Sequence, residues 1–403
     1  MKVSIIIPTV RPEKALRCVE AIHENAGVDI QEYEIVREVD IGSIGCPRMV
    51  ADLVSKSRYD WIMFLGDDTI PQQDFLKNAL SATKELKDGW GMVGLSDGIH
   101  ADNFSTHWMC HKRMLELTGD EFFHTGYIHQ YCDVELTDIA KENDRFVFAE
   151  NARLVHDHPL VTGKGFDDHY LKATSKNVHL QDRKLYFERR AQRTGNKYKL
   201  AIGLPVTNEG VDMLFFKSFI QLHRPETEMI YPKHGAHPGD MARIRNSIVK
   251  DAIYKNCTHI LFMDTDQVYH DPYMIMRLLG HDLDLVGGLV HRRWEPYEPI
   301  AQRDGEHVPD DEINKGGLIK ADTTGTGCLL IKTDVFLNLE PPFFKTVLDE
   351  NDNVKTGEDV YFCRKAKKAG YQLYVDADVT IGHLAKIQIG KGFYEIYKKI
   401  ARG

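Results

Sequence analysis

Short apolar runs alternate with amphipathic segments along the chain, and most of the runs end abruptly at a proline or an aspartate. In the first half, the runs predict strands and the segments between them predict helices. The predicted strands are Val3–Ile7, Tyr33–Val39, Trp61–Leu65 and Gly91–Leu95, and the predicted helices are Glu13–Glu24, Arg48–Lys56 and Asp74–Lys87. This alternation is typical of an α/β fold, with a mostly parallel sheet covered by helices.

The second half repeats the same order of elements. Its predicted strands are Leu200–Pro205, Glu228–Tyr231, His259–Met263 and Leu283–Leu289, and its predicted helices are Val211–Leu222, Met241–Tyr254 and Pro272–Leu279. In such sheets ligands bind beyond the carboxyl ends of the strands. The polar residues that follow each run are therefore the first candidates for a site.

Two of the apolar runs end in paired carboxylates. Ile62–Thr69 ends in Gly-Asp-Asp-Thr, and Ile260–Gln267 ends in Asp-Thr-Asp-Gln. Carboxylates gathered at a sheet edge suit Mg²⁺ or Mn²⁺, particularly when a phosphorylated substrate supplies further oxygen ligands. Aspartates at a strand end can also be plain helix caps.

The two halves match in an ordered series, which predicts an internal duplication. The matches pair Gly66–Asp68 with Asp264–Asp266, Lys112–Leu117 with Thr333–Leu339, Phe122-Phe123 with Phe343-Phe344, Asp133-Val134 with Asp359-Val360, His158 with His383, and Gly163–Phe166 with Gly390–Phe393. We expect one domain over 1–170, a basic helical linker over 171–199 and a second domain over 200–403.

Composition excludes several classes of protein. The chain has 403 residues, a net charge of −9 and 42% hydrophobic residues, which suits two soluble domains and gives no general attraction to nucleic acid. The seven cysteines are scattered without a Cys-x-x-Cys pair, which favours free thiols in a reducing compartment. Since no run approaches the roughly 20 apolar residues of a membrane span, we expect a cytoplasmic protein without an integral membrane segment. The sequence does not indicate an oligomeric state.

The segment Lys172–Lys199 is strongly basic and has two interpretations. It can be a solvated helix that joins the domains. Alternatively, its arginines, together with Tyr186 and Phe187, can form a docking strip for a polyanion such as DNA.

Further residues of the second half fit a sugar-transfer site. Glu358 and Asp359 open a predicted helix, where a carboxylate is either a cap or a general base. His383 follows an apolar strand and is a candidate metal ligand. The glycines of Thr324–Cys328 allow a ligand to approach the backbone, although the segment is not a phosphate-binding loop.

Taken together, both halves resemble GT-A glycosyltransferases of the family 2 type. The resemblance rests on Ser4–Thr9, Arg245-Asn246, the Asp-x-Asp of Asp264–Asp266, Gly325–Cys328, Glu358-Asp359 and His383. It implies two tandem GT-A domains that bind a nucleotide-diphosphate sugar, most simply a UDP-sugar, together with Mn²⁺ or Mg²⁺.

In the second half, the resemblance assigns a role to each residue. Asp266 and His383 would hold the metal, and Asp359 would be the catalytic base. The nucleotide would lie near Pro205, Arg243, Arg245, Asn246 and Asp264. One base without an enzyme nucleophile predicts direct displacement with inversion.

The first half departs from the pattern, because Gly66 replaces the first aspartate and Cys132 replaces Glu358. By the same resemblance, Asp68 and His158 would bind metal and Asp133 would be the base. The nucleotide would lie near Pro8, Thr9, Arg11, Asp40, Arg48 and Asp67. This half is either a second transferase or a degenerate copy that binds acceptor or supports its neighbour.

The segment Val290–Ala321 is long, polar and aromatic, whereas its counterpart Ser96–Thr106 is short. Such a loop can select the acceptor or act as a lid. Trp294 and Tyr297 could stack on a sugar or a base, or they could simply anchor the loop.

Several functions remain open from the sequence. The acceptor can be a polysaccharide or other glycan, with two sites that add two sugars in succession. The second half also resembles transferase-like proteins of phages, for which the acceptor would be a hydroxymethylated DNA base in the host cytoplasm. A sugar-nucleotide-binding scaffold is the alternative without catalysis. A nucleotidyltransferase is disfavoured, because neither first strand is followed by a glycine-rich, lysine-containing signature.

Overall fold

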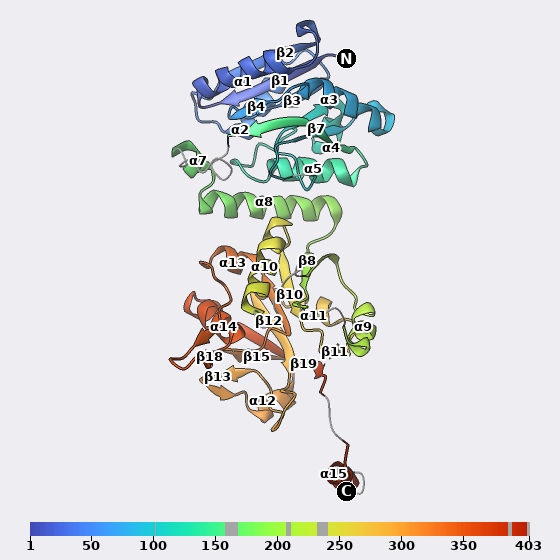
Figure 1. Ribbon diagram of the computed structural model, residues 1–403, viewed down its shortest axis with the longest axis vertical. Coiled ribbons are helices and arrows are strands. Elements are labelled where there is room, and N and C mark those ends of the chain that lie inside the picture. The colour runs from blue at the N-terminus through green and yellow to red at the C-terminus, as the bar shows by residue number, and fades with distance from the viewer. Residues whose placement is uncertain (101, 158–167, 207–210, 232–240, 386–388, 401–403) are drawn as a thin grey trace. The chain divides into compact units, whose positions relative to one another are not determined.

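The computed structural model describes the chain except residues 101, 158–167, 207–210, 232–240, 386–388 and 401–403 (Figure 1). The chain divides into two compact units, Met1–Lys197 and Tyr198–Gly403. Each unit has its own sheet and its own apolar core. The units are therefore described one at a time.

The first unit alternates strands and helices from its beginning. Its elements are β1 Val3–Thr9, α1 Pro12–Asn25, η1 Ile30–Glu32, β2 Tyr33–Val39, α2 Cys46–Lys56, β3 Trp61–Phe64, β4 Thr69–Pro71, α3 Phe75–Ala82, η2 Thr83–Glu85, η3 Lys87–Gly89, β5 Met92–Ser96, β6 Trp108–His111, η4 Lys112–Met114, α4 Leu115–Thr118, α5 Cys132–Glu142, β7 Phe146–His156, α7 Asp168–Ala173 and α8 Lys176–Thr194.

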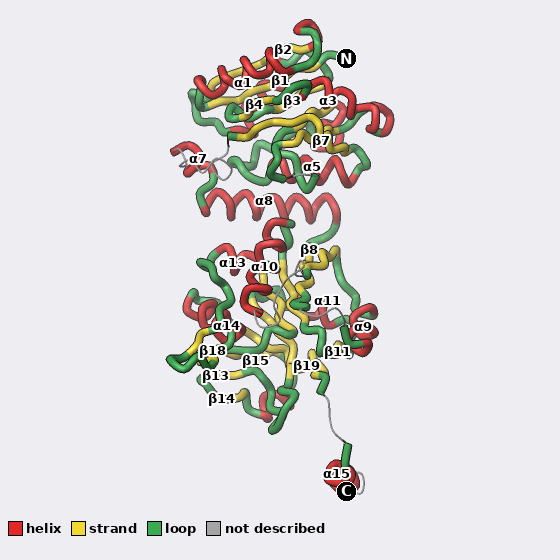
Figure 2. The backbone as a smooth tube through the Cα atoms, in the orientation of Figure 1, coloured by secondary structure: helices red, strands yellow, loops and turns green. Residues whose placement is uncertain are grey.

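The sheet of the first unit has the order β2-β1-β3-β6-β5-β7-β4. Strands β6 and β4 run against the others, so the sheet is mostly parallel. Residues of β1 alternate between the two faces: Val3 and Ile5 pack with α1 and α3, whereas Ile6 packs with α2 and α5. This alternation is the two-residue period of a strand buried on both sides. Figure 2 shows the helices on the outside of the strands.

The basic helix α8 packs against α5 of the first unit (Figure 1). Arg193 donates to Glu142 at 2.8 Å, and both Arg193 and Arg189 donate to Glu135, at 3.0 and 2.9 Å. The carboxylate of Asp182 accepts from three consecutive backbone amides of the segment before α5, at 2.7 to 2.9 Å. The segment expected to be a linker is thus a helix held to the first unit by its own arginines.

The second unit contains more short strands. Its elements are β8 Lys199–Gly203, α9 Met213–Ile220, β9 Glu226–Ile230, α10 Met241–Tyr254, β10 His259–Met263, β11 Gln267–Tyr269, α11 Met274–Gly280, β12 Leu285–Val290, β13 Gln302–Arg303, β14 Glu306–His307, α12 Asp310–Lys315, β15 Leu318–Ala321, β16 Cys328–Lys332, α13 Thr333–Leu337, β17 Val347–Leu348, β18 Val354–Thr356, α14 Glu358–Lys368, β19 Leu373–His383 and α15 Lys391–Ile400. Among the described residues, no helix is long and apolar enough to cross a membrane.

The second sheet repeats the first. Its order is β9-β8-β10-β16-β12-β19-β11, with β15 added beside β19, and each step has the same relative direction as in the first unit. Even the register shift recurs, between Leu95 and Ser96 and between Gly288 and Leu289. Helices α9 and α11 cover one face, and α10, α13 and α14 cover the other. Positions in the two units can therefore be equated strand by strand.

The expected fold class, α/β with mostly parallel sheets flanked by helices, is confirmed. The predicted bounds of β2, α10 and β10 agree with the structure. The helix expected over Asp74–Lys87 is shorter, because α3 ends at Ala82 and two 3-10 turns follow. The sequence did not predict the antiparallel strands β6 and β16, which lie in the middle of the two sheets.

Candidate functional site

In the second unit, two carboxylates follow β10 where it ends at Met263. The amide of Asp264 donates to the carbonyl of Gly327 at 3.0 Å, which ties the aspartates to the glycine-rich segment before β16. A Cβ at position 327 would lie 2.8 Å from Asp264 Oδ2 and 2.1 Å from Gln267 Nε2. A larger residue here would displace the side chains of Asp264 and Gln267, so the glycine-rich segment shapes the acidic strand end.

Asp266 faces His383. The two residues are brought together because β11 pairs with β19 in a register that sets Gln267 opposite His383. His383 Nε2 lies 3.5 Å from Asp266 Oδ2, and His383 Nδ1 lies 2.8 Å from the carbonyl oxygen of His291. Since a carbonyl only accepts, Nδ1 carries a proton and Nε2 is left to act as a ligand. Metal-binding histidines are commonly oriented in this way.

A buried arginine connects the aspartates to α14. Arg245 is 4% exposed; it donates to Glu358 through Nη1, and its Nη2 lies 3.4 Å from Asp264 Oδ1. Burial raises the pKa of Asp264, while the charge of Arg245 opposes that rise. The predicted pair of Arg245 and Asp264 is thus brought together, with Glu358 as a third member.

Asp359 lies at the first turn of α14, next to Glu358 of the Arg245–Glu358 pair. Its Oδ1 accepts from the amide of Val360 at 2.7 Å. Burial raises the pKa of the Asp359 carboxyl, and the neighbouring charge of Glu358 raises it further. A Cβ at Gly325 would lie 3.9 Å from Asp359 Oδ2. The glycine-rich segment therefore contacts Asp264 at one end and lies close to Asp359 at the other.

The loop after β12 supplies a residue that sequence reasoning missed. Arg293 Nη1 donates to Asp266 Oδ2 at 2.5 Å. The loop folds back on itself, with His291 bridged to Pro299. Trp294 and Tyr297 are 58% and 51% exposed, so they do not anchor the loop by burial.

Three other predicted nucleotide residues have different surroundings. Pro205 is buried just after β8, and Arg243 lies on the exposed side of α10. Asn246 donates to the carbonyls of Ala242 and Phe344 at 2.7 and 2.8 Å, and its oxygen accepts from the amides of Phe343 and Phe344. Because both ends of this amide are occupied, Asn246 holds the segment before β17 in place, and its expected nucleotide contact stays a prediction.

The first unit repeats the histidine–aspartate pair. His156 is opposite Thr69 in the pairing of β4 with β7, as His383 is opposite Gln267 in the second unit. His156 Nε2 lies 3.4 Å from Asp68 Oδ1. The register therefore makes His156 the equivalent of His383. The predicted ligand His158 lies outside the described residues.

The acidic pair of the first unit is covered by an arginine. Arg11 contacts both Asp67 and Asp68, with Nη2 at 3.1 Å from Asp68 Oδ2, and Thr9 Oγ1 donates to Asp67 Oδ2 at 2.6 Å. Burial alone would raise the pKa of Asp68, but His156 and Arg11 outweigh it and lower that pKa below its usual range. The predicted residues thus lie together in a network of ion pairs and hydrogen bonds, which joins Thr9, Arg11, Asp67 and Asp68.

A thiol stands where the second unit has Glu358. Cys132 precedes Asp133 as Glu358 precedes Asp359, and Cys46 lies near both, because Asp133 raises the pKa of Cys46 and Cys46 raises the pKa of Cys132. Burial raises the pKa of Cys46 to about 12, so this thiol is neutral. Burial also raises the pKa of Asp133, to about 6. The first unit therefore keeps the base position and lacks the cation beside it.

Of the three remaining predicted residues of the first unit, one holds a loop in place and two are at least partly exposed. Asp40 accepts from the amides of Ile44 and Gly45, both at 2.9 Å, and so closes the loop before α2. Arg48 is exposed on α2, and Pro8 is half-buried near the end of β1. Asp40 thus has a structural role that its position after a strand did not reveal.

The donor set of the second unit fits a hard divalent cation. Asp266 offers carboxylate oxygens, and His383 offers an oriented imidazole nitrogen. Mn²⁺ accepts this mixture, and Mg²⁺ accepts the oxygens, with a diphosphate completing the coordination. The sequence predicted that Asp266 and His383 would act together, and it gave no sign of Arg293 because an exposed loop arginine carries no pattern.

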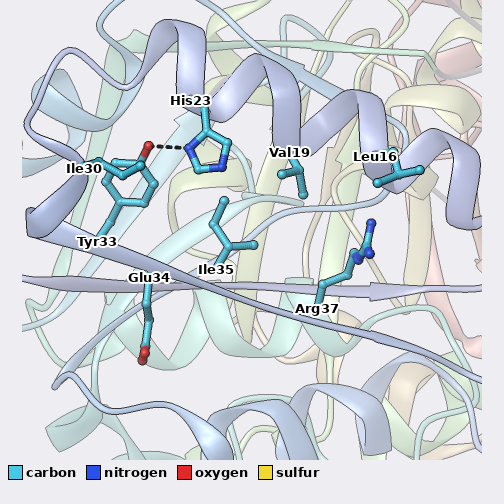
Figure 3. Close-up of a pocket in the computed structure, with 8 residues that line it drawn as sticks. All are labelled: Leu16, Val19, His23, Ile30, Tyr33, Glu34, Ile35 and Arg37. Atoms are coloured by element: carbon cyan, nitrogen blue, oxygen red, sulfur yellow. Dashed lines mark hydrogen bonds between the residues drawn. The ribbon is translucent and has the colours of Figure 1, made fainter.

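A separate hollow lies on the far edge of the first sheet, between α1 and β2. Figure 3 shows Tyr33, Ile35 and Arg37 of β2 facing this hollow, and His23 Nδ1 is 2.8 Å from the Tyr33 hydroxyl. None of the predicted site residues lines it. The chemistry at the strand ends, rather than this hollow, defines the candidate site.

Comparison of the sequence with protein families gives no matching family profile, and no curated protein matches either. Among solved structures, the mannosyltransferase PcManGT from Pyrobaculum calidifontis, solved with GDP-Man and Mn²⁺, is 14% identical with a TM-score of 0.38, over 47% of this chain and 64% of that chain. Residues 1–349 of TarS from S. aureus are 12% identical with a TM-score of 0.33, over 48% and 73%. A197 from STIV is 16% identical with a TM-score of 0.31, over 48% and 98%. Likenesses of this size carry no argument about activity, which has to come from the side chains.

Proposed function

We propose that the second unit is a metal-dependent glycosyltransferase that moves a sugar from a nucleotide-diphosphate donor to an acceptor hydroxyl. The observation that carries the proposal is the facing pair of Asp266 and His383, with the proton of His383 fixed by the His291 carbonyl. Beside this pair, the glycine-rich segment leads to Asp359. A metal pair and a separate carboxylate are the two elements that such a transfer needs.

In the proposed reaction, Asp359 removes the proton from the acceptor hydroxyl as the oxygen attacks the sugar. Its raised pKa suits a base that must hold a proton after the transfer. The bound cation would neutralise charge on the leaving diphosphate. Arg245 keeps Glu358 and Asp264 in place without entering the reaction. With one base and no enzyme nucleophile, we expect inversion at the sugar carbon.

For the donor, the family resemblance makes UDP-sugars the first candidates, and we propose a UDP-sugar. For the acceptor, we propose a polysaccharide or another glycan. Its docking surface would include Trp294 and Tyr297, whose rings are exposed in the loop that carries Arg293. Stacking on sugar rings would use those exposed faces.

A DNA acceptor receives less support. It drew on the basic segment, but Arg189 and Arg193 of α8 are paired with Glu135 and Glu142. Arginines held in such pairs offer little charge to phosphates. Binding of duplex or single-stranded DNA that weakens steeply with salt would restore this alternative.

The first unit is the weaker candidate for catalysis. It keeps Asp68, His156 and Asp133, but Arg11 covers the acidic pair and Cys132 replaces Glu358. We propose that it supports the second unit or binds an acceptor. A bifunctional enzyme with two active units is the competing proposal.

The test is donor hydrolysis with Mn²⁺ over UDP-, GDP-, CMP- and dTDP-sugars, with Asp68→Ala and Asp266→Ala measured alongside. We expect hydrolysis of one donor, lost in Asp266→Ala and kept in Asp68→Ala. Asp284→Ala is the matched control, because Asp284 is an exposed aspartate of the same unit that pairs with Lys332. Activity that survives Asp266→Ala would contradict the assignment, and a second donor lost only in Asp68→Ala would establish two active units.

A further inference from the structure

Three strand ends of the first unit bring an aspartate and two histidines together beside Asp68. Asp97 directly follows β5, His107 directly precedes β6 and His156 ends β7. Strands β6, β5 and β7 are neighbours, and their directions place these three ends at one edge of the sheet. One potential ligand atom from each side chain lies within 4.8 Å of the other two.

The surroundings of His107 fix which of its nitrogens is available. Thr106 Oγ1 donates to Asp97 Oδ2 at 2.8 Å, so its oxygen is left to accept from His107 Nδ1, at 2.9 Å. Nδ1 therefore carries the proton and Nε2 carries the lone pair. A Cβ built on Gly66 would lie 3.2 Å from His107 Nε2 and 2.9 Å from Asp68 Oδ1, so the ligand nitrogen and the Asp68 carboxylate border the same space.

His156 completes the group. Its ring meets that of His107 edge to face, with 4.9 Å between centroids, and its two nitrogens lie 3.8 Å from Asp97 and 3.4 Å from Asp68. Asp97 and His107 are nearly inaccessible to solvent, and His156 is only 13% exposed. The arrangement is buried, preformed and built from two imidazoles and two carboxylates.

Among its described residues, the second unit has no counterpart of this donor set at these positions. The shared register places Cys328 at the position of His107 and Val290 at the position of Asp97. The second unit therefore offers one imidazole and carboxylates, whereas the first offers two imidazoles. Imidazole-rich sites favour metals late in the first transition row, and Zn²⁺ in particular takes histidine and aspartate in four-coordinate sites.

We propose that the first unit binds Zn²⁺ through Asp97, His107 and His156, with Asp68 as the adjoining carboxylate. The two units would then hold different metals at equivalent strand ends: Zn²⁺ in the first, and a hard cation at Asp266 and His383 in the second. The zinc would tie β5, β6 and β7 together at one edge. This inference does not rest on the proposed function, because it concerns metal binding by the first unit alone.

The competing explanation is a closed network of ion pairs. His156 lies between Asp68 and Asp97, and Arg11 neutralises Asp68 from the other side. In that case the histidine proton takes the place of the metal, and no Zn²⁺ enters. A direct measurement of Zn²⁺ binding distinguishes the two explanations.

The experiment uses the full chain carrying Asp266→Ala, which silences the second unit. Zn²⁺ binding is measured by competition with a chromogenic chelator, and Co²⁺ substitution is followed by visible absorption. We expect about one Zn²⁺ per chain and the intense Co²⁺ bands of a four-coordinate site with nitrogen ligands. In His107→Gln and in Asp97→Asn, we expect Zn²⁺ affinity to fall at least ~10-fold. His23→Gln is the control, since His23 is an exposed histidine that contacts Tyr33 outside the cluster.

Circular dichroism would verify that each variant is folded. The Co²⁺ spectrum of the chain with only Asp266→Ala decides the matter even if the cluster variants do not fold. Absence of a four-coordinate Co²⁺ spectrum there, or Zn²⁺ affinity unchanged in both folded variants, would overturn the proposal. Because no nucleotide or sugar is present, failure of zinc binding leaves the proposed transfer untouched, and loss of transfer leaves zinc binding untouched.

Discussion

Arg293 and Asp266 form an ion pair with 2.5 Å between Nη1 and Oδ2, although they are 27 positions apart. The pair puts a guanidinium on the carboxylate that would bind the metal, and the loop that carries Arg293 also provides the carbonyl that orients His383. Metal and arginine compete for the same oxygen, so binding of the cation requires Arg293 to turn away. The diphosphate of a donor is the natural next partner for the released guanidinium.

This competition predicts the behaviour of Arg293→Ala. Without nucleotide, the variant should bind Mn²⁺ up to ~5-fold more tightly, because the exposed ion pair that the metal must break is worth at most ~1 kcal/mol. With a nucleotide diphosphate present, the advantage should vanish or reverse, since the variant has lost a phosphate contact. Titration calorimetry with Mn²⁺ alone, and then with Mn²⁺ and UDP, measures both effects.

Arg292→Ala is the control for that measurement, because Arg292 lies next in the chain and faces Glu298, at 3.6 Å. It should leave both affinities unchanged. Weaker Mn²⁺ binding by Arg293→Ala in the absence of nucleotide would show that the arginine supports the metal site instead of competing with it.

The position of Asp359 predicts a change in turnover without a change in binding. Asp359→Asn should lower kcat by ~10²–10⁴, the usual contribution of a general base. Donor affinity should be kept, because Asp359 is proposed to act on the acceptor hydroxyl, whereas Asp266 and His383 would hold the metal that binds the donor. Since only the ionised carboxyl acts as a base and its pKa is raised, activity of the unsubstituted protein should be low in acid and rise with pH through that pKa.

Initial rates across pH, with donor binding measured in parallel, test this prediction. Asp349→Asn is the control, because Asp349 is an exposed aspartate of the same unit that only caps a turn. Full turnover in Asp359→Asn would show that Asp359 is not the catalytic base.

Local patterns along the sequence were sufficient for the elements and for the acidic strand ends. The apolar run of β10 is buried throughout, and a strand that ends before Asp264 can be recognised from the local sequence alone. Strand β6 was missed because its pairing with β3 and β5 is antiparallel and joins residues far apart in the chain. Long-range pairing of this kind has no local signal.

The site residues show the same division. His156 and His158 are two positions apart, and only the pairing of β4 with β7 identifies His156 as the partner of Asp68. Asn246 follows an arginine, as the resemblance expects of a nucleotide-binding residue, yet its side-chain amide is hydrogen-bonded to backbone groups near Phe343. A side chain in a plausible motif can bind a ligand or only support the fold. The two cases are distinguished by whether its hydrogen-bonding atoms already have partners in the protein.

The Arg245–Glu358 pair predicts a stability difference between single and double substitutions. Arg245→Met should destabilise the second unit by ~2–4 kcal/mol, because it leaves Glu358 without its partner in a half-buried place. Adding Glu358→Gln removes the stranded charge and should recover part of that loss. Denaturant unfolding of the two single variants and the double variant gives the coupling energy. Additive effects would mean that the two side chains act independently.

The buried carboxyl of Asp133 should make the first unit less stable as the pH rises from about 4 to about 6. Burial raises its pKa to about 6 from an ordinary value near 3.8, so between these pH values the folded chain keeps a proton that the unfolded chain has released. The stability contributed by this proton is present at pH 4 and is lost as the pH passes 6, at a cost of roughly 1–3 kcal/mol. Asp133→Asn should remove this fall, whereas Asp144→Asn, at an exposed position of the same unit, should keep it. Unfolding free energies measured between pH 4 and pH 7 test the prediction, and a fall that persists in Asp133→Asn would assign the effect to another group.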